Sequence, residues 1–255
     1  SVKRDVRLEL PSRHLGLVQA QERDGLEKFM VDSGGIIGDS VDLDALADLH
    51  HDFQAPPEIS LVPPLGQRVA IARDEAFSFI YPHLLTGWRQ QGAELRFFSP
   101  LADEAVPGDA DAVFLPGGYP ELHSHRLAAS ENFKTSLRDA AQRSATVYGE
   151  CGGYMTLGNR LIDAEGVAHE MASLLPVTTS FAQRKLALGY RNARLLSPLG
   201  AVAAGHVVAT HEFHYSTVAE QQTADALFIA SDALGNDLGA VGLQRGSVSG
   251  SYLHM

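Results

Sequence analysis

The sequence predicts an α/β protein with a mainly parallel sheet, helices on both of its faces and a β-rich carboxyl-terminal part. Between residues 68 and 148, short apolar segments alternate with helical ones, and this pattern is typical of parallel strands buried on both faces. From Lys185 onward, strand-like alternation replaces the helical periodicity. The 255 residues also exceed a typical domain of about 100–200 residues, so we expect a second, smaller part.

The smaller part is expected to comprise residues 1–66. Residues 6–20 predict a strand with a polar insert, and residues 42–49 predict a helix with its apolar face turned inward. Four prolines and a glycine in the segments 54–58 and 63–66 favour neither a helix nor a central strand. We therefore place a domain boundary between residues 1–66 and residues 67–255.

The larger part predicts a regular succession of elements. In chain order we expect a strand over 68–72, a helix over 81–91, strands over 94–98 and 111–115, a helix over 131–143, a strand over 145–148, a strand over 206–215 and a hairpin over 240–253. The carboxyl ends of neighbouring parallel strands meet in one crevice, so residues that follow these strands are candidates for a shared site.

Composition excludes several classes of function. Thirty-one acidic residues against twenty lysines and arginines give a net charge of −11, which disfavours nucleic-acid and membrane partners by electrostatic repulsion. The one cysteine cannot form a disulfide within the chain, so a reducing cytoplasm is the expected compartment. No histidine cluster has the spacing of a zinc site, and no metal site is predicted.

Cys151 stands in the pattern Gly149-Glu-Cys-Gly-Gly153, between a predicted strand and a predicted helix. A buried structural cysteine is one interpretation. A nucleophile on a sharp strand-to-helix turn is the other, and the glycines favour it because such a turn brings the flanking backbone segments close together. The start of a helix would also lower the thiol pKa.

A second glycine pair, Gly117-Gly118, follows the strand predicted at 111–115. It is either a plain turn or a loop whose backbone NH groups bind an oxyanion next to Cys151. A cysteine nucleophile also needs a base, and the eleven histidines offer several candidates. His211 and His214 would point to opposite faces of one strand, so they are not expected to bind one metal ion together.

Four segments together resemble the cobyrinate and hydrogenobyrinate a,c-diamide synthases, which are glutamine-dependent ligases of cobalamin biosynthesis. They are Pro116-Gly-Gly-Tyr-Pro-Glu-Leu122, Gly149-Glu-Cys-Gly-Gly-Tyr-Met155, Glu212-Phe-His-Tyr-Ser216 and Gly250-Ser-Tyr-Leu-His254. The resemblance extends from about residue 67 to residue 255 and reaches into residues 10–17. It implies a class I glutamine amidotransferase domain with a flavodoxin-like fold, preceded by a remnant of a P-loop-type synthetase domain.

The resemblance also implies roles for individual residues. Cys151 would be the nucleophile and His254 the base, and an oxyanion hole would include Gly117, Gly118 and Gly152. The acid that orients the histidine in many related glutaminases would follow His254, where this chain has only Met255, so we expect a Cys-His dyad. The residues that could bind glutamine or the acceptor are Tyr119, His211, Glu212, His214 and Tyr215.

The implied partners are glutamine, a corrinoid acceptor (cobyrinate or hydrogenobyrinate) and a synthetase domain on the amino-terminal side. That domain would use ATP and magnesium, whereas this chain contains no G-x-x-x-x-G-K-[ST] loop and needs no cofactor of its own. Two alternatives stay open on the sequence. One is the glutaminase domain of cobyric acid synthase or of another tetrapyrrole amidase, and the other is a non-catalytic docking domain of the same fold.

Overall fold

The computed structural model describes residues 2–13, 16–18, 20–50 and 61–255, and the chain divides into two units, Ser1–Ser60 and Leu61–Met255. The proline-containing segment 54–58 and His51 lie outside the described residues. The first unit contains the helices α1 (Leu26–Ser40) and α2 (Leu43–Ala47), the 3-10 helices η1 (Val6–Leu8) and η2 (Ala20–Glu22), and the two-residue strands β1 (Ser12–Arg13) and β2 (Gly16–Leu17).

Two expectations for the first unit are wrong. Residues 6–20 do not form one strand, because the Asp5 carboxylate accepts a hydrogen bond from the Arg7 amide at 2.9 Å and begins a 3-10 turn. The helix at 42–49 is present as α2, but its apolar face is not covered within the described residues, since Leu43, Leu46 and Leu49 are all exposed.

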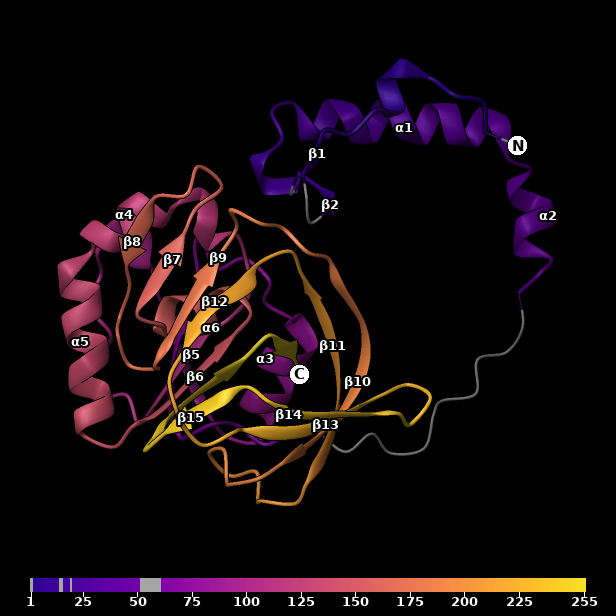
Figure 1. The fold of residues 1–255 in the computed structure, drawn as a ribbon. Helices are drawn as coiled ribbons and strands as arrows, with labels where there is room; N and C mark the ends of the chain where they lie inside the picture. The colour runs from indigo at the N-terminus through magenta and orange to yellow at the C-terminus, as the bar shows by residue number, and fades with distance from the viewer. Residues whose placement is uncertain (1, 14–15, 19, 51–60) are drawn as a thin grey trace. The chain divides into compact units, whose positions relative to one another are not determined.

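A six-stranded sheet forms the centre of the second unit (Figure 1). Its order is β15-β16-β6-β5-β3-β4, in which the five strands from β16 to β4 run parallel and β15 is an antiparallel edge. The strands are β3 (Arg68–Ala72), β4 (Glu94–Phe98), β5 (Ala112–Leu115), β6 (Thr146–Glu150), β15 (Leu243–Arg245) and β16 (Val248–Ser251). The prediction of a mainly parallel sheet is confirmed.

Both faces of this sheet are buried. On one face, Phe133 and Leu137 of α5 (Glu131–Gln142) pack in a core with Val113 and Val147. The helices α4 (Ser124–Ala129) and α6 (Gly152–Leu157) also contribute to this core, and η3 (Pro100–Ala102) and η4 (Pro120–Leu122) lie in the connections. On the other face, Trp88 of α3 (Pro82–Gln90) packs against Phe114 with ring centroids 5.6 Å apart.

A second, antiparallel sheet of order β14-β13-β10-β11-β17 shares the core on the α3 side, so this face is covered by strands as well as by a helix (Figure 1). Its strands are β10 (Ala187–Leu195), β11 (Val207–His214), β13 (Phe228–Asp232), β14 (Asp237–Val241) and β17 (Leu253–His254). The pairing of β11 with β17 sets His211 opposite His254. The predicted β-rich carboxyl-terminal part is thereby confirmed.

A third sheet of order β12-β9-β7-β8 completes the unit. It contains β7 (Arg160–Ile162), β8 (Ala168–Glu170), β9 (Val177–Ser180) and β12 (Thr217–Gln221). Over the residues that the structure describes, none of the helices has the length and apolar character that a membrane span requires.

Candidate active site

Cys151 occupies the turn between β6 and α6, at the carboxyl edge of the parallel sheet. Its backbone has φ 46° and ψ −99°, which is strained for a residue with a side chain. The Cys151 amide donates to the Ser251 carbonyl at 2.8 Å, and the Met155 amide donates to the Cys151 carbonyl at 3.0 Å. The sheet and the helix therefore fix the strained turn from both sides, as a nucleophile elbow requires.

Glycine is required around Cys151 because three backbone segments nearly touch. A Cβ at Gly152 would lie 2.9 Å from Cδ of Pro120 and 3.1 Å from the backbone nitrogen of Gly118. A Cβ at Gly118 would overlap the Ala76 carbonyl oxygen. The loop containing Gly118 and the elbow are thus in contact, and the backbone amides of Gly118 and Gly152 lie close together.

His254 adjoins the same loop. A Cβ at Gly117 would lie 2.5 Å from Cε1 of His254, so the imidazole rests against the backbone of Gly117. The structure therefore brings together the loop, the elbow and the late histidine, although they come from sequence segments more than 30 residues apart. Their chemical roles stay predictions at this point.

Cys151 is completely buried, and its Sγ is 4.0 Å from the Phe213 carbonyl oxygen. Burial raises the pKa of the Cys151 thiol, and the negative charge of Glu121 raises it further, whereas the Gly152 amide lowers it. We expected the start of a helix to give a lowered thiol pKa, and for the net pKa this expectation is wrong, because desolvation outweighs the single helix amide. Cys151 is accordingly a neutral thiol in this structure.

The His254 imidazole is buried among polar groups on its Nδ1 side. Nδ1 is 3.4 Å from the Tyr81 hydroxyl oxygen and 3.8 Å from Oε2 of Glu150. Its ring stacks on His211 with centroids 4.6 Å apart and an interplanar angle of 15°. Burial lowers the pKa of His254 to about 3, and His211 and His214 contribute in the same direction. His254 is therefore a neutral imidazole near pH 7.

Sequence reasoning missed Glu150, which precedes the cysteine. Its side chain is fully buried, and Oε1 accepts a hydrogen bond from the Met255 amide at 3.1 Å. Its other oxygen, Oε2, has no hydrogen-bond partner among the described residues. Burial raises the pKa of Glu150 to about 8. An acidic residue in the short turn between the buried strand predicted at 145–148 and Cys151 was the available signal, because a charged group in a buried position needs a partner.

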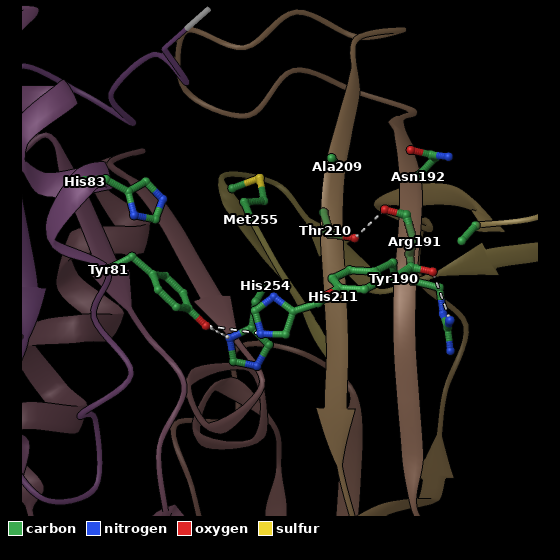
Figure 2. Close-up of a pocket in the computed structure, with 11 residues that line it drawn as sticks. Tyr81, His83, Tyr190, Arg191, Asn192, Ala209, Thr210, His211, His254 and Met255 are labelled. Atoms are coloured by element: carbon green, nitrogen blue, oxygen red, sulfur yellow. Dashed lines mark hydrogen bonds between the residues drawn. The ribbon is translucent and has the colours of Figure 1, made fainter. Parts of the chain in front are cut away.

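A cavity of about 500 Å³ adjoins His254 (Figure 2). Tyr81 and His83 line it from the start of α3, His211 lines it from β11, and Tyr190 and Arg191 line it from β10 (Figure 2). Figure 2 shows the Tyr81 hydroxyl directed toward both imidazoles, and it lies 3.2 Å from Nε2 of His211. His211, predicted as a binding residue, therefore faces the cavity together with His254, and Tyr81 is an addition that the sequence did not suggest.

Glu212 and His214 lie on the opposite face of β11 and contact each other. Oε1 of Glu212 is 3.0 Å from Nε2 of His214, and its Oε2 accepts from Nε of Arg191 at 3.0 Å. The His214 ring stacks on Tyr252 with centroids 3.7 Å apart. The neighbouring His214 and the Arg191 guanidinium hold the pKa of Glu212 below its ordinary value. These contacts stabilise the second sheet, and a binding role for the pair stays a prediction.

Tyr119 and Tyr215 are placed differently from each other. Tyr119 is buried beside the glycine loop and meets the Phe79 ring edge-on, with centroids 5.2 Å apart. Tyr215 is half-buried and contacts the Phe213 ring, whose centroid is 6.2 Å away. Tyr119 therefore packs beside the glycine loop, whereas Tyr215 directly follows the end of β11.

Comparison with known proteins gives three findings. Residues 68–255 match the model of the CobB/CobQ-like glutamine amidotransferase domain. The whole chain is 52% identical over 258 residues to hydrogenobyrinate a,c-diamide synthase of Brucella abortus, and 97% of it aligns at 51% identity with the protein of that name from Rhodobacter capsulatus. The chain spans 58% and 57% of the length of these two relatives.

The fold has solved counterparts. The structure of PurLQS from Thermotoga maritima superposes with a TM-score of 0.50 at 14% identity, covering 73% of this chain and 86% of that chain. At this identity the likeness concerns the fold alone. It agrees with the expected fold of a class I glutamine amidotransferase.

Proposed function

Because the chain belongs to the family of CobB/CobQ-like glutamine amidotransferase domains, we propose that it hydrolyses the side-chain amide of glutamine and supplies the ammonia to a corrinoid amidation. The observation that carries the proposal is the strained Cys151 elbow packed against the Gly117-Gly118 loop, on which the His254 imidazole rests. A buried structural cysteine needs neither a positive φ nor glycines on both sides.

In the first half of the reaction, Cys151 and His254 act on the amide carbon of glutamine. His254 takes the thiol proton as Sγ bonds to that carbon, and the amide oxygen becomes an oxyanion. The C–N bond then breaks, the electron pair goes to nitrogen, and the imidazolium gives its proton to the departing ammonia. A thioester between Cys151 and the glutamyl group remains.

In the second half, water replaces ammonia. His254 takes a proton from water while the oxygen bonds to the thioester carbon, and the C–S bond breaks with its electron pair on sulfur. The imidazolium returns its proton to the Cys151 thiolate. The balance is glutamine and water to glutamate and ammonia, with the enzyme unchanged.

The backbone amides of Gly118 and Gly152 are the proposed oxyanion donors. A Cβ on Gly152 would lie 3.1 Å from the Gly118 nitrogen, so the two segments are in contact, and the amide of Gly152 lowers the pKa of the thiol. Two such fixed donors stabilise the charge that appears only after attack, and losing one donor costs about 3–4 kcal/mol of barrier in comparable sites. Gly117 is a third proposed donor, and its missing side chain also gives the His254 imidazole room to approach.

We further propose that this ammonia amidates the a and c acetate carboxylates of hydrogenobyrinate in a longer enzyme of which this chain is the carboxyl-terminal part. The support is the name of the relatives, which are 51–52% identical to this chain and longer than it. ATP and magnesium would belong to the synthetase domain, because this sequence carries no phosphate-binding lysine loop. The cytoplasm is the proposed compartment.

A covalent label tests the glutaminase. The glutamine analogue 6-diazo-5-oxo-L-norleucine is expected to add one glutamyl-like group per chain at Cys151, as read by mass spectrometry of the peptides, and Cys151→Ser is expected to take up none. Glutamate release from glutamine by the 255-residue chain or by the longer enzyme is measured in parallel. The absence of both the adduct and glutamate release would instead support the non-catalytic docking domain.

The acceptor requires a second experiment. The longer enzyme, supplied with glutamine, ATP and magnesium, is offered hydrogenobyrinate, cobyrinate or a corrinoid that already carries both amides. We expect two amide groups on hydrogenobyrinate by mass spectrometry. Amidation only of the corrinoid that already carries the a and c amides would identify the cobyric acid synthase type of enzyme.

A further inference from the structure

We propose that Glu150 is the positioning residue for His254 and holds the imidazole with its proton on Nδ1. The inference rests on the proposed function, since it assigns a part in the same reaction. Glu150 is the residue before the nucleophile, so one short turn would supply both the nucleophile and the group that orients the base.

The contacts of the carboxylate carry this inference. Oε1 accepts from the backbone amide of Met255, which fixes the chain directly after His254 against β6. Oε2 lies 3.8 Å from Nδ1 of His254 and has no hydrogen-bond partner among the described residues. Both side chains are buried, with 0% of Glu150 and 2% of His254 exposed. A buried carboxylate oxygen without a partner is costly unless it faces a positive or hydrogen-bonding group. The imidazole at 3.8 Å is such a group, and the buried Tyr148 hydroxyl, which lowers the pKa of Glu150, is a second.

The second neighbour of Nδ1 leads to the same tautomer. The Tyr81 hydroxyl lies between Nδ1 of His254 at 3.4 Å and Nε2 of His211 at 3.2 Å, and it has one hydrogen to donate. If His254 carries its proton on Nδ1, Tyr81 accepts from His254 and donates to His211. The other tautomer would set the lone pair of Nδ1 against the carboxylate oxygen of Glu150. The Nδ1 tautomer leaves Nε2 free to receive the thiol proton.

The charge on this pair changes during the reaction. Burial raises the pKa of Glu150 to about 8 and lowers that of His254 to about 3, so a proton on the imidazole is costly unless the carboxylate beside it is ionised. The other titratable groups facing the pair are Tyr81, Tyr148, Cys151, His211 and His214. Turnover is therefore expected to rise with pH through the titration of Glu150, at about pH 8.

Glu150→Gln tests the inference through kinetics. We expect kcat for glutamine hydrolysis to fall about 100-fold or more, as when the orienting acid of a serine protease triad is made an amide. KM is expected to change little, and the rise of activity near pH 8 is expected to disappear. Glu170→Gln, on an exposed side chain in β8, is the matched control and should keep both kcat and the pH profile. A Glu150→Gln variant with kcat within about threefold of the parent, and the same pH profile, would overturn the inference.

The tautomer of His254 gives a readout that does not depend on activity. Long-range ¹H–¹⁵N spectra of the full chain with labelled histidine, with the His254 signals assigned from His254→Gln, are expected to show a protonated Nδ1 at pH 9, where the Glu150 carboxylate is ionised. In Glu150→Gln the population protonated on Nε2 should increase. A His254 protonated on Nε2 in the unaltered chain overturns the inference even if Glu150→Gln does not fold. A chain that shows the Nδ1 tautomer but neither labels nor hydrolyses glutamine contradicts the proposed function alone.

Discussion

Single atoms decide the geometry around the proposed nucleophile. The Cα of Gly117 has a hydrogen where any other residue would carry a Cβ, and that position is 2.5 Å from Cε1 of His254 and 3.2 Å from the Phe79 ring. The imidazole can approach the loop only because Gly117 has no side chain. The position of the His254 ring thus depends on the absence of a side chain at Gly117, which lies in a different segment of the chain.

We therefore expect Gly117→Ala to impair turnover more than stability. The added methyl group must displace the His254 ring, and a shift of about 1 Å in a catalytic group can cost about 100-fold in rate. Steady-state glutamate release should fall by about that factor, while the melting temperature changes little. Gly108→Ala is the control, since a Cβ there has no atom within 4 Å and should leave the rate unaltered. Equal rates for the two variants would show that His254 does not depend on this contact.

Among the elements, the register of β10 and β11 matters most for the candidate site. It sets His211 on the face of His254 and sets Glu212 beside Arg191 on the other face. The half-buried Arg191 and Glu212 and the buried His214 then form one hydrogen-bonded group that spans the two strands. The register is therefore fixed by charged contacts as well as by apolar packing.

Glu212→Gln is expected to destabilise the protein by about 1–3 kcal/mol near pH 7, because hydrogen bonds from charged donors lose their ionised acceptor. The pKa of Glu212 is lowered in the folded state, so its stabilisation is present above its ordinary value of 4.5 and is lost as the pH falls. The cost of the variant should shrink correspondingly in acid. Urea unfolding at pH 7 and pH 4 measures it, with Glu170→Gln of the exposed Arg160–Glu170 pair as a control that should cost less than about 1 kcal/mol. A cost that is independent of pH would contradict the charged network.

The elements that sequence predicts best are those whose pattern is local. β3 and β4 have the predicted bounds, since each is a short strand-like segment between turn residues. Residues 6–20 were assigned wrongly, because a side-chain cap at Asp5 competes with the extended chain there. The hydrophobic periodicity of the sequence contains no signal for such a cap.

For the candidate site, too, local sequence patterns are predictable and contacts between distant segments are not. The glycine bracket of Cys151 is a local signal, and the family resemblance identifies His254. Glu150 becomes a neighbour of His254 only through the pairing of β6 with β16, and Tyr81 only through the position of the residue that precedes α3. Those contacts depend on the register of strands distant in sequence, so the chain alone indicates neither the contact of Tyr81 with His254 nor that of Glu150, although the acidic residue before Cys151 was itself a signal.

On the scale of the whole molecule, the two units differ in their cores. Every buried apolar residue among the described residues lies between Leu65 and Leu253, and neither α1 nor α2 contains a buried residue. Residues 61–255 therefore hold the apolar core found in the described part of the chain. The domain boundary that we place after residue 66 stays a prediction.

Removal of residues 1–60 tests whether the second unit folds without the first. We expect the remaining chain to unfold within about 3 °C of the full chain, since a change of about 1 kcal/mol moves the melting temperature of a 150–250-residue domain by roughly 2–4 °C. The shortened chain should also keep the Cys151 labelling. A fall of more than about 10 °C, or an insoluble product, would show that the first unit belongs to the folding unit of the second.

The buried pair Glu150 and His254 makes stability depend on pH. The pKa of Glu150 rises from 4.5 to about 8 on folding, so stability falls as the pH rises through this window. The pKa of His254 falls from 6.5 to about 3, so stability falls as the pH drops through that window. The two effects oppose each other between about pH 4.5 and 6.5 and are uncompensated outside it. Their combined contribution is most favourable in mildly acidic solution.

The corresponding measurement is the melting temperature of Glu150→Gln relative to the unaltered chain from pH 4 to pH 9. The stability of the variant relative to the unaltered chain should increase from about pH 4.5 to pH 8 and then level off, because a glutamine side chain at position 150 does not ionise. Glu165→Gln, in an exposed turn, should give a difference that does not vary with pH. A constant difference for Glu150→Gln would show that Glu150 titrates normally in the folded protein.

The burial of Cys151 has a consequence for oxidative chemistry. Peroxides react with accessible thiolates, and a fully buried neutral thiol offers them neither access nor charge. In the proposed mechanism, the sulfur becomes reactive only when a substrate reaches Sγ and His254 removes the proton. Hydrogen peroxide should therefore inactivate the protein slowly at rest and faster during turnover, so that the resting enzyme carries its own protection against oxidation.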